Sequence, residues 1–482
     1  MKLKHINIPI KTQKVLLLIA IFIMSFTICT HKMIDFDFWF HYDCGRYIVQ
    51  TGQIPTSAIG SWYGLENNLP WISHEWLFGV ICYYLANWFG LGSLPFIAGA
   101  FMAIMLTWIV AITINKNIKH PVVPILVMLF LSFISTGAAV MRPQLFLYLF
   151  TMILFLLLRS EIDNPSKKIF WLILLTIAWV NLHGGSYILI FFFSFLFFAL
   201  DGIHFKLGRL KFKGCDKQTS NKRFLILLIC FACVALNAHG LEMYSYPFTN
   251  MNDATMLSMI REWRQLNLAS FELLYLVVPL IYFIKVIASE KDIDGYRFIF
   301  LLGLTAMTLR SVRFGIQLNL VASLLLLDDI VAVDKHFDIT YVLLIPFILL
   351  YFIIQFIYSD ISLVAEPFDM TLYPSDPIIE KTKEIKPQRL YNHYDFGGYL
   401  LYNEIPVFID GRADIYSSYN MKDFKKISNC DYGFKETLEQ YNFDYFMVTK
   451  SENLYDYLIE RTENYELITE DEGYALFKNT EN

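Results

Sequence analysis

Long apolar runs separated by short polar connections fill most of the chain up to about residue 358. The runs lie near residues 15–30, 94–114, 121–138, 143–158, 169–182, 185–203, 224–238, 270–287, 297–309, 314–330 and 340–358. A helix needs roughly 20 apolar residues to cross a bilayer, and several runs are shorter, so their ends are defined only to within a few residues. The pattern predicts a mostly α membrane protein in which residues 1–359 form a polytopic domain of about eleven transmembrane helices.

The distribution of lysine and arginine predicts which side of the membrane each connection faces. The most basic connection is 204–223, and the first apolar run follows a lysine-rich N-terminus. Cytoplasmic loops carry an excess of positive charge, so we expect both segments in the cytoplasm. No small-x-small cleavage site follows the first run, which we interpret as an uncleaved helix. The sequence thus predicts a multi-pass protein of the plasma membrane with a cytoplasmic N-terminus and an extracytoplasmic C-terminal domain.

The interpretation of residues 75–92 decides how many times the chain crosses the membrane before the 204–223 connection. Counting these residues as a span would place that connection outside. The segment is rich in tryptophan and tyrosine, which favour the headgroup region of a membrane. We interpret it as a helix lying in the interface, after an outer loop at 31–74; a true span is the alternative.

Composition supports the membrane interpretation. Hydrophobic residues make up 56% of the chain and charged residues only 17%, a balance more apolar than that of soluble domains. The net charge of -5 argues against nucleic acid as a partner. No glycine-rich phosphate-binding motif is present, so a nucleotide site has no support in the sequence.

Residues 360–482 have the mixed polar composition of a soluble domain. Short strands are predicted at 389–392, 407–410 and 445–449, and helices at 422–426 and 434–441. Residues 465–469 and 474–478 suggest a closing hairpin. We expect a small extracytoplasmic α/β domain, with the Asp410–Asp414 turn following a strand end, where ligand-binding loops commonly lie.

Residues 35–47, DFDFWFHYDCGRY, place two carboxylates beside aromatic residues at the membrane boundary. In an extended stretch Asp35 and Asp37 would point the same way. A carboxylate with few waters around it holds a divalent cation or acts as a base toward a hydroxyl or amide. The alternative is an interfacial aromatic belt whose acids simply reach water.

Other polar residues on the predicted outer face are candidates for binding substrate, because polar groups at membrane depth are costly and usually functional. Arg310 and Arg313 suit a polyprenyl phosphate, since guanidinium groups present paired donors. Helix capping, turns, lipid anchoring and solvated loops are the structural alternatives for all of them. The remaining candidates are His74, Glu75, Arg142, His183, His239 and Glu242.

Two segments resemble one known family. Residues 37–42 (DFWFHY), the following Arg46–Tyr47 pair and residues 61–63 (SWY) resemble the first outer loop of the oligosaccharyltransferase catalytic subunit, with Phe38 where that family has proline. Residues 393–397 (HYDFG) are similar to the Trp-Trp-Asp-Tyr-Gly segment that helps recognise the acceptor peptide there, and residues 406–412 are similar to the strand and aspartate that follow it. Both tryptophans are replaced here, and the motif's acid is Asp395.

The resemblance implies a membrane glycosyltransferase of the C-type (GT-C) superfamily. Such an enzyme moves sugar from a polyprenyl-phosphate carrier to an acceptor glycan, lipid or protein at the outer membrane face. It implies Asp37 as the catalytic aspartate, acting as a base or metal ligand with Asp35 in support, and Mg²⁺ or Mn²⁺ as a metal that Asp37 could hold. The alternatives are a transporter or flippase for lipid-linked precursors, which should show inverted repeats, and a non-catalytic envelope assembly protein.

Overall fold

The computed structural model describes residues 9–114, 122–159, 165–201, 205–212, 217–253, 255–256, 260–330, 351 and 364–481. The chain forms two compact units. Unit one comprises Met1–His31, Gly92–Leu236 and Arg261–Pro367, and unit two comprises Lys32–Leu91, Asn237–Ile260 and Phe368–Asn482.

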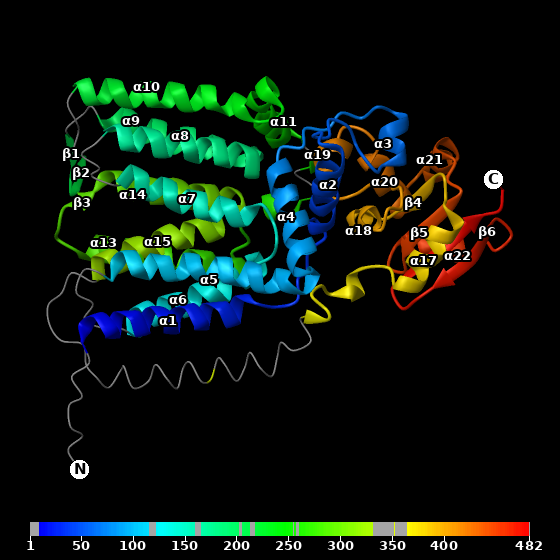
Figure 1. The fold of residues 1–482 in the computed structure, drawn as a ribbon, viewed down its shortest axis with the longest axis horizontal. Helices are drawn as coiled ribbons and strands as arrows, with labels where there is room; N and C mark the ends of the chain where they lie inside the picture. Colours follow the sequence, from blue (N-terminus) through cyan, green and yellow to red (C-terminus); the bar gives the residue numbers. More distant parts are fainter. Residues whose placement is uncertain are drawn as a thin grey trace, which may run out of the picture. The chain divides into compact units, whose positions relative to one another are not determined.

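Unit one is a bundle of long helices that lie side by side (Figure 1). The described helices match the first ten predicted apolar runs, whereas the eleventh, at 340–358, lies outside the described residues except for Tyr351. They are α1 (Ile10–Cys29), α5 (Leu94–Thr113), α6 (Val122–Ser135), α7 (Gln144–Arg159), α8 (Pro165–Leu182), α9 (Ile188–Asp201), α10 (Lys217–Cys233), α13 (Val277–Ala288), α14 (Gly295–Arg310) and α15 (Gly315–Ile330). Short 3-10 turns join or extend them at η1 (Leu91–Ser93), η2 (Thr136–Ala138), η3 (Gly184–Ser186), η4 (Val234–Leu236), η6 (Arg261–Trp263), η7 (Phe271–Leu276) and η8 (Val312–Phe314).

Helix α15 forms the core of this bundle. It packs against α5, α6, α7, α13 and α14, and its side chains from Ile316 to Leu327 are buried. Peripheral helices instead expose large apolar side chains such as Phe133, Phe192 and Ile284. An apolar surface of this kind, on helices that are hydrophobic all round, is the surface that a bilayer covers.

Three helices among the described residues are long and apolar enough to cross a membrane: Lys11–Cys29, Leu91–Thr113 and Phe271–Ala288. The other apolar helices are shorter, so the total of eleven spans stays a prediction. The helices themselves establish a membrane-type, mostly α architecture.

The basic connection at 204–223 is more structured than a plain loop. Strands β1 (Phe205–Leu207) and β2 (Leu210–Phe212) pair as an antiparallel hairpin, and β3 (Ile293–Asp294) joins β2 in parallel. Lys206 pairs with Asp292 at 2.7 Å, which ties this hairpin to the segment before α14.

Unit two begins with two helices that cross closely, α2 (Phe38–Thr51) and α4 (Trp76–Phe89), joined by a loop that contains α3 (Trp62–Glu66). Gly45 and Gly79 meet at the crossing, where a methyl group on Gly45 would lie 2.0 Å from the Gly79 carbonyl oxygen. Segment 237–260 adds η5 (Gly240–Tyr244) and α11 (Tyr246–Asn252).

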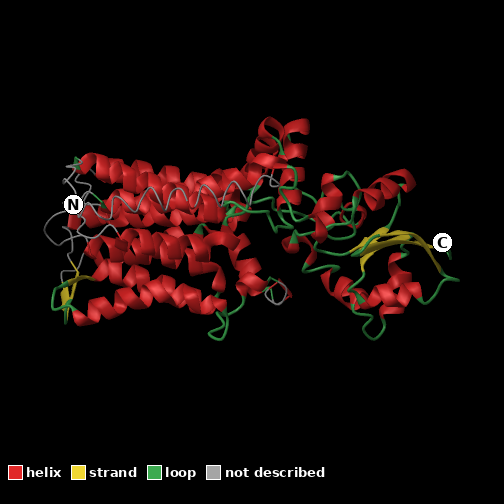
Figure 2. Ribbon diagram, turned by 90° about the horizontal axis from the view of Figure 1, so that it is seen from below, coloured by secondary structure: helices red, strands yellow, loops and turns green. Residues whose placement is uncertain are grey.

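The C-terminal part of unit two is built around a four-stranded sheet in the order β4-β5-β7-β6 (Figure 2). Its strands are β4 (Leu390–Asn392), β5 (Tyr445–Thr449), β6 (Tyr465–Glu470) and β7 (Tyr474–Asn479). The first two pair in parallel and the last two form the predicted antiparallel hairpin. The helices are η10 (Met370–Leu372), α17 (Asp376–Ile385), α18 (Gly397–Tyr402), α19 (Ala413–Tyr416), α20 (Met421–Ser428), α21 (Phe434–Tyr441) and α22 (Asn453–Ile459).

The strand predicted at 407–410 is wrong. Val407 makes only an isolated bridge with Ser61, and side-chain amides satisfy the backbone beyond it. The Asn392 carboxamide accepts from the Phe408 N–H at 2.8 Å and donates to the Ile409 carbonyl at 2.8 Å, while Asn420 donates to the Phe408 carbonyl at 3.2 Å. Backbone N–H and C=O groups that bond to side chains are not available to pair with a neighbouring strand.

The structure also groups the chain differently from the predicted boundary near 360. The outer loop at 31–74 and the helix at 75–92 were assigned to the membrane domain, but residues 32–91 belong to the same unit as the C-terminal domain. The reason is packing: α2 lies against both α4 and α18. Apolar patterning along the chain does not report such long-range contacts.

Candidate acidic site in unit two

Asp35 and Asp37 lie at the N-terminus of α2 in different environments. The chain bends at residues 36–37 instead of running extended, so the predicted parallel orientation of two carboxylates on a strand is wrong. Asp35 is fully buried; its Oδ1 accepts from the Asp37 N–H at 3.1 Å, and its carbonyl accepts from the Tyr373 hydroxyl at 2.6 Å. Asp37 is half-buried. Helix α2 is described in full, and the Asp37 side chain forms no capping hydrogen bond with its backbone N–H groups. Asp35 therefore supports the bend, and Asp37 is the carboxylate with access to solvent.

The turn at Gly411 lies directly against Asp37. A methyl group on Gly411 would lie 3.0 Å from Asp37 Oδ1 and 3.1 Å from the Phe40 ring. The Tyr394 hydroxyl donates to the Gly411 carbonyl at 3.0 Å. Burial raises the pKa of Tyr394 well above its usual value, and the nearby charges of Asp37 and Asp410 raise it further. Tyr394 is therefore a neutral hydroxyl at neutral pH.

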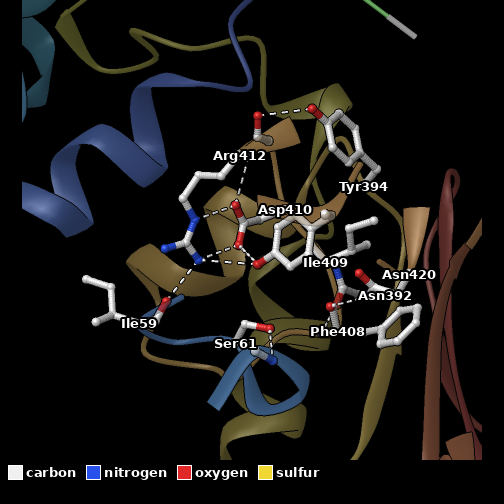
Figure 3. A network of polar contacts seen from close by, with 12 residues as sticks. Ile59, Ser61, Asn392, Tyr394, Phe408, Ile409, Asp410, Arg412 and Asn420 are labelled. Carbon is white, nitrogen blue, oxygen red and sulfur yellow. Dashed lines mark hydrogen bonds and ion pairs between the residues drawn. The ribbon is translucent and has the colours of Figure 1, made fainter. Parts of the chain in front are cut away.

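A buried ion pair fixes this turn (Figure 3). The Arg412 guanidinium donates to both oxygens of Asp410, at 2.7 and 2.6 Å, and to the Ile59 carbonyl at 2.9 Å. The Tyr416 hydroxyl donates to Asp410 Oδ2 at 2.6 Å. Asp410 and Arg412 are both buried, and a buried pair with this many hydrogen bonds holds its backbone in one arrangement.

The segments that carry the family resemblance also touch one another. A methyl group on Gly398 of α18 would lie 3.1 Å from the Phe36 carbonyl oxygen and 3.2 Å from the Phe40 nitrogen of α2, so glycine permits the close approach. Arg46 donates to the carbonyls of Leu401 and Tyr402 at the end of α18, at 2.7 and 3.0 Å. These contacts give Arg46 a structural role in joining the first loop to the C-terminal domain.

A second group of titratable side chains lies on the same unit, at the far end of the 410–414 turn. Glu75 lies between two imidazoles, 3.6 Å from His41 Nε2 and 3.4 Å from His74 Nε2. The Tyr246 ring packs on His74 with 4.4 Å between ring centroids, and its hydroxyl donates to Asp414 Oδ2 at 3.0 Å. We call these five residues the His74 cluster.

The charges in the His74 cluster shift the pKa of its members. Burial alone would lower the pKa of His74, but Glu75 and Asp414 more than offset it, so the pKa is raised. Burial raises the pKa of Asp414, against the opposing effect of His74. Outside this cluster, burial lowers the pKa of His239, whose Nε2 lies 2.9 Å from the Ser73 hydroxyl. Ser73 itself donates to the Pro55 carbonyl, so a neutral His239 donates to Ser73.

In unit one, three of the predicted residues, Arg142, His183 and Arg313, lie close to η6. Arg142 pairs with Glu262 at 2.9 Å. The Arg313 guanidinium donates to His183 Nε2 at 3.0 Å and lies over the Trp263 ring at 5.9 Å. In the part of the chain that the structure describes, no carboxylate pairs with Arg313, whose charge is therefore available to an anion.

The other predicted residues are exposed. Arg310 is exposed at the last residue of α14, and Glu242 is exposed in η5. Asp395 is exposed, with its carboxylate 3.8 Å from His393.

No pattern in the sequence indicates Tyr246 as a neighbour of the site. His41 and Tyr394 stand inside the motifs that carry the resemblance, and Asp414 ends the turn singled out by position. Their roles depend on contacts between segments hundreds of residues apart, which a single sequence does not specify.

The described residues do not fit the expected divalent metal. No three of their His, Cys, Asp or Glu side chains lie where they could hold one ion together. Asp35 Oδ1 accepts a hydrogen bond from the Asp37 backbone N–H. Oxygen-coordinated metals require several converging ligands, so we derive no step through a metal.

Comparison with solved structures identifies the fold. The chain is similar to the archaeal oligosaccharyltransferase AglB from Archaeoglobus fulgidus, determined in complex with an inhibitory peptide and a dolichol-phosphate, with a TM-score of 0.54 at 9% identity. The match covers 91% of this chain and 69% of that chain. No family model and no curated protein sequence matches the chain. The likeness shows a distant oligosaccharyltransferase-like fold.

Proposed function

We propose that the protein is a membrane glycosyltransferase that moves a sugar from a polyprenyl-phosphate-linked donor to an acceptor at the outer face of the membrane. The observation that carries the proposal is Asp37, a solvent-accessible carboxylate held against the rigid 410–412 turn in a chain with an oligosaccharyltransferase-like fold. A fold alone does not specify a function, so the proposal depends on this carboxylate as a residue that could perform transferase chemistry.

Asp37 is the proposed general base. As an acceptor hydroxyl or amide attacks the anomeric carbon, the carboxylate takes its proton, and the bond from that carbon to the phosphate oxygen breaks. Asp35 keeps Asp37 in place by accepting its backbone N–H, and the Asp410–Arg412 pair fixes the opposing turn. Positioning of this kind lowers the barrier because the reacting groups need no further ordering.

Within unit one, we propose Arg313 as a group that binds the phosphate of a lipid carrier. A guanidinium group binds phosphate oxygens through paired hydrogen bonds. His183 and Trp263 orient this side chain. Arg310 is a second cation, exposed three positions earlier.

The test is sugar transfer by Asp37→Asn in membranes that contain a radiolabelled lipid-linked sugar. Asparagine keeps the shape of the side chain but not its basicity, so we expect turnover to fall by about 100-fold or more. The matched control is Asp431→Asn, which removes an exposed carboxylate elsewhere on unit two. It should transfer sugar at the wild-type rate.

Unchanged turnover in Asp37→Asn would remove Asp37 from the mechanism. An absence of transfer by the wild-type protein with every lipid-linked donor from its own membranes would contradict the transferase itself.

A further inference from the structure

Unit two contains a hollow of about 740 Å³ that none of the steps above uses. It lies where two parallel strands end, since β4 stops at Asn392 and β5 at Thr449, and the loops that follow them line it. The third side comes from the turn between β6 and β7. Crevices outside the carboxyl ends of parallel strands are the usual ligand sites of open α/β sheets.

The rim of the hollow is polar and exposed. Asp395 and Glu472 contribute carboxylates from two different loops, and Ser451 and Asn453 contribute a hydroxyl and an amide. Asn453 donates to the Asn429 carbonyl at 2.9 Å, which fixes the orientation of its amide. These groups accept and donate hydrogen bonds at several points, as a ligand with many hydroxyl groups requires.

Phenylalanine and tyrosine side chains also line the hollow. Phe396 and Tyr474 are buried and pack edge to face with 5.4 Å between their centroids, whereas Phe36 is only half-buried and keeps an accessible ring surface. Polar groups together with an accessible aromatic ring suit an amphipathic ring, which presents both hydroxyl groups and C–H surface.

The charge of the hollow disfavours anions. Lys450, the one lysine among the described residues that line it, is bonded to Glu470 at 2.9 Å, so its ammonium charge is already balanced. Glu452 accepts from the Tyr391 hydroxyl and the Thr449 N–H, which leaves Asp395 and Glu472 as the rim charges. An acidic or phosphorylated ligand would place like charges together, which is destabilising.

We propose that this hollow binds a neutral saccharide. Carboxylate oxygens of Asp395 and Glu472 would accept from its hydroxyl groups, Ser451 and Asn453 would bond to further hydroxyls, and its C–H face would pack on Phe36. That the bound saccharide is the acceptor rests on the proposed function; binding itself does not.

The experiment uses the full chain in lipid nanodiscs and three neutral probes: maltohexaose, cellohexaose and hexa-N-acetylchitohexaose. Ligand-observed NMR and calorimetry should detect binding of at least one of them. We expect Asp395→Ala to weaken it about tenfold, as loss of a charge-assisted hydrogen bond implies, and Ser451→Trp, which fills the rim from an exposed position, to abolish it. Glu439→Ala, an exposed carboxylate away from the hollow, is the control and should bind as wild type.

Three results would overturn the saccharide site: no binding of any neutral probe, equal binding by Ser451→Trp, or stronger binding of oligogalacturonate or of a lysine-rich peptide. The outcome is separable from that of the proposed function. Asp37→Asn should bind the probe as wild type does while losing transfer, whereas probe binding by a protein that never transfers sugar would contradict only the transferase.

Discussion

Two aspartates that stand two residues apart, Asp35 and Asp37, show how environment assigns different roles to the same side chain. Asp35 is enclosed and bonded to backbone and so stabilises the start of α2, whereas Asp37 keeps access to solvent beside Gly411. A buried carboxylate that accepts backbone hydrogen bonds is typical of structural support. At the scale of residues, the candidate base is therefore Asp37 alone.

Gly411 should be as important for activity as Asp37 itself. In Gly411→Ala the new methyl group would lie 3.0 Å from Asp37 Oδ1, so the carboxylate must move. A displacement of about 1 Å at a reacting group costs on the order of 100-fold in rate, and we expect transfer to fall by roughly that factor. Gly137→Ala, where no atom lies within 4 Å of the added methyl, should keep full activity in the same assay.

The His74 cluster predicts a pH-dependent contribution to stability. The pKa of His74 is raised in the folded protein, so its charged form stabilises the fold below the unfolded value of 6.5, and this contribution is lost as pH rises through the raised folded value. Thermal melts of the wild type and His74→Gln should therefore differ more at pH 5.5 than at pH 9.

His239 supplies the opposite case as a control. Its pKa is lowered from 6.5 by burial, so the stability that its neutral form contributes is present above that value and lost as pH falls. The melting difference between wild type and His239→Gln should grow with pH. If the melting difference changed with pH in the same direction for both variants, the opposite pKa shifts of His74 and His239 would be contradicted.

At the scale of elements, close approach between helices shapes unit two. Helices α2 and α4 meet through Gly45 and Gly79, and α18 approaches α2 through Gly398. Removing a side chain at each crossing lets the backbones come within contact distance, as small residues do between packed helices. Helix α2 consequently holds Asp37, His41 and Arg46 against three different neighbours.

Gly45→Ala should weaken this packing. Its methyl group would lie 2.0 Å from the Gly79 carbonyl oxygen, which belongs to backbone and cannot rotate away. We expect a loss of about 1–3 kcal/mol in the free energy of unfolding, the usual cost of overpacking, measured by denaturant titration in detergent. Gly52→Asn is the control on the same helix: its φ of 70° suits asparagine and the space around it is open, so stability should change little. If the two variants had the same free energy of unfolding, α4 would be shown to shift away from the new methyl group without destabilising the fold.

At the scale of the whole molecule, each unit gathers three separate stretches of sequence. Unit one is a helical bundle whose apolar outer surface requires a bilayer, and unit two combines the first polar loop with the C-terminal sheet domain. The predicted topology assigns all of the stretches of unit two to the outer face of the membrane, and the basic 204–223 connection to the cytoplasm.

Cysteine labelling tests this topology. In a variant whose native cysteines are serine, Tyr432→Cys should react with a membrane-impermeant maleimide in intact cells, because position 432 is fully exposed on unit two. Lys206→Cys, also exposed, should react only after the cells are lysed. The reverse pattern would invert the orientation and place Asp37 in the cytoplasm, where a polyprenyl-linked donor at the outer face could not reach it.

The sequence by itself determined the helices of unit one, the mostly α membrane class and most of the C-terminal elements. Apolar runs, turn residues and the alternation in the closing hairpin are local signals, and each element forms from its own residues. The same local signals singled out Asp37 within a motif that resembles the oligosaccharyltransferase loop, although helix α2, which follows Asp37, was not predicted.

Only the tertiary structure decided what surrounds these residues. Residues 407–410 have the composition of a strand, but Asn392 and Asn420 take their backbone hydrogen bonds and leave no ladder. The contacts of Asp37 with Gly411 and of His74 with Tyr246 join segments separated by long stretches of chain. Side chains from several distant segments could form hydrogen bonds with the same buried polar groups. The pattern along a single sequence does not show which of these side chains forms the bond in the folded protein.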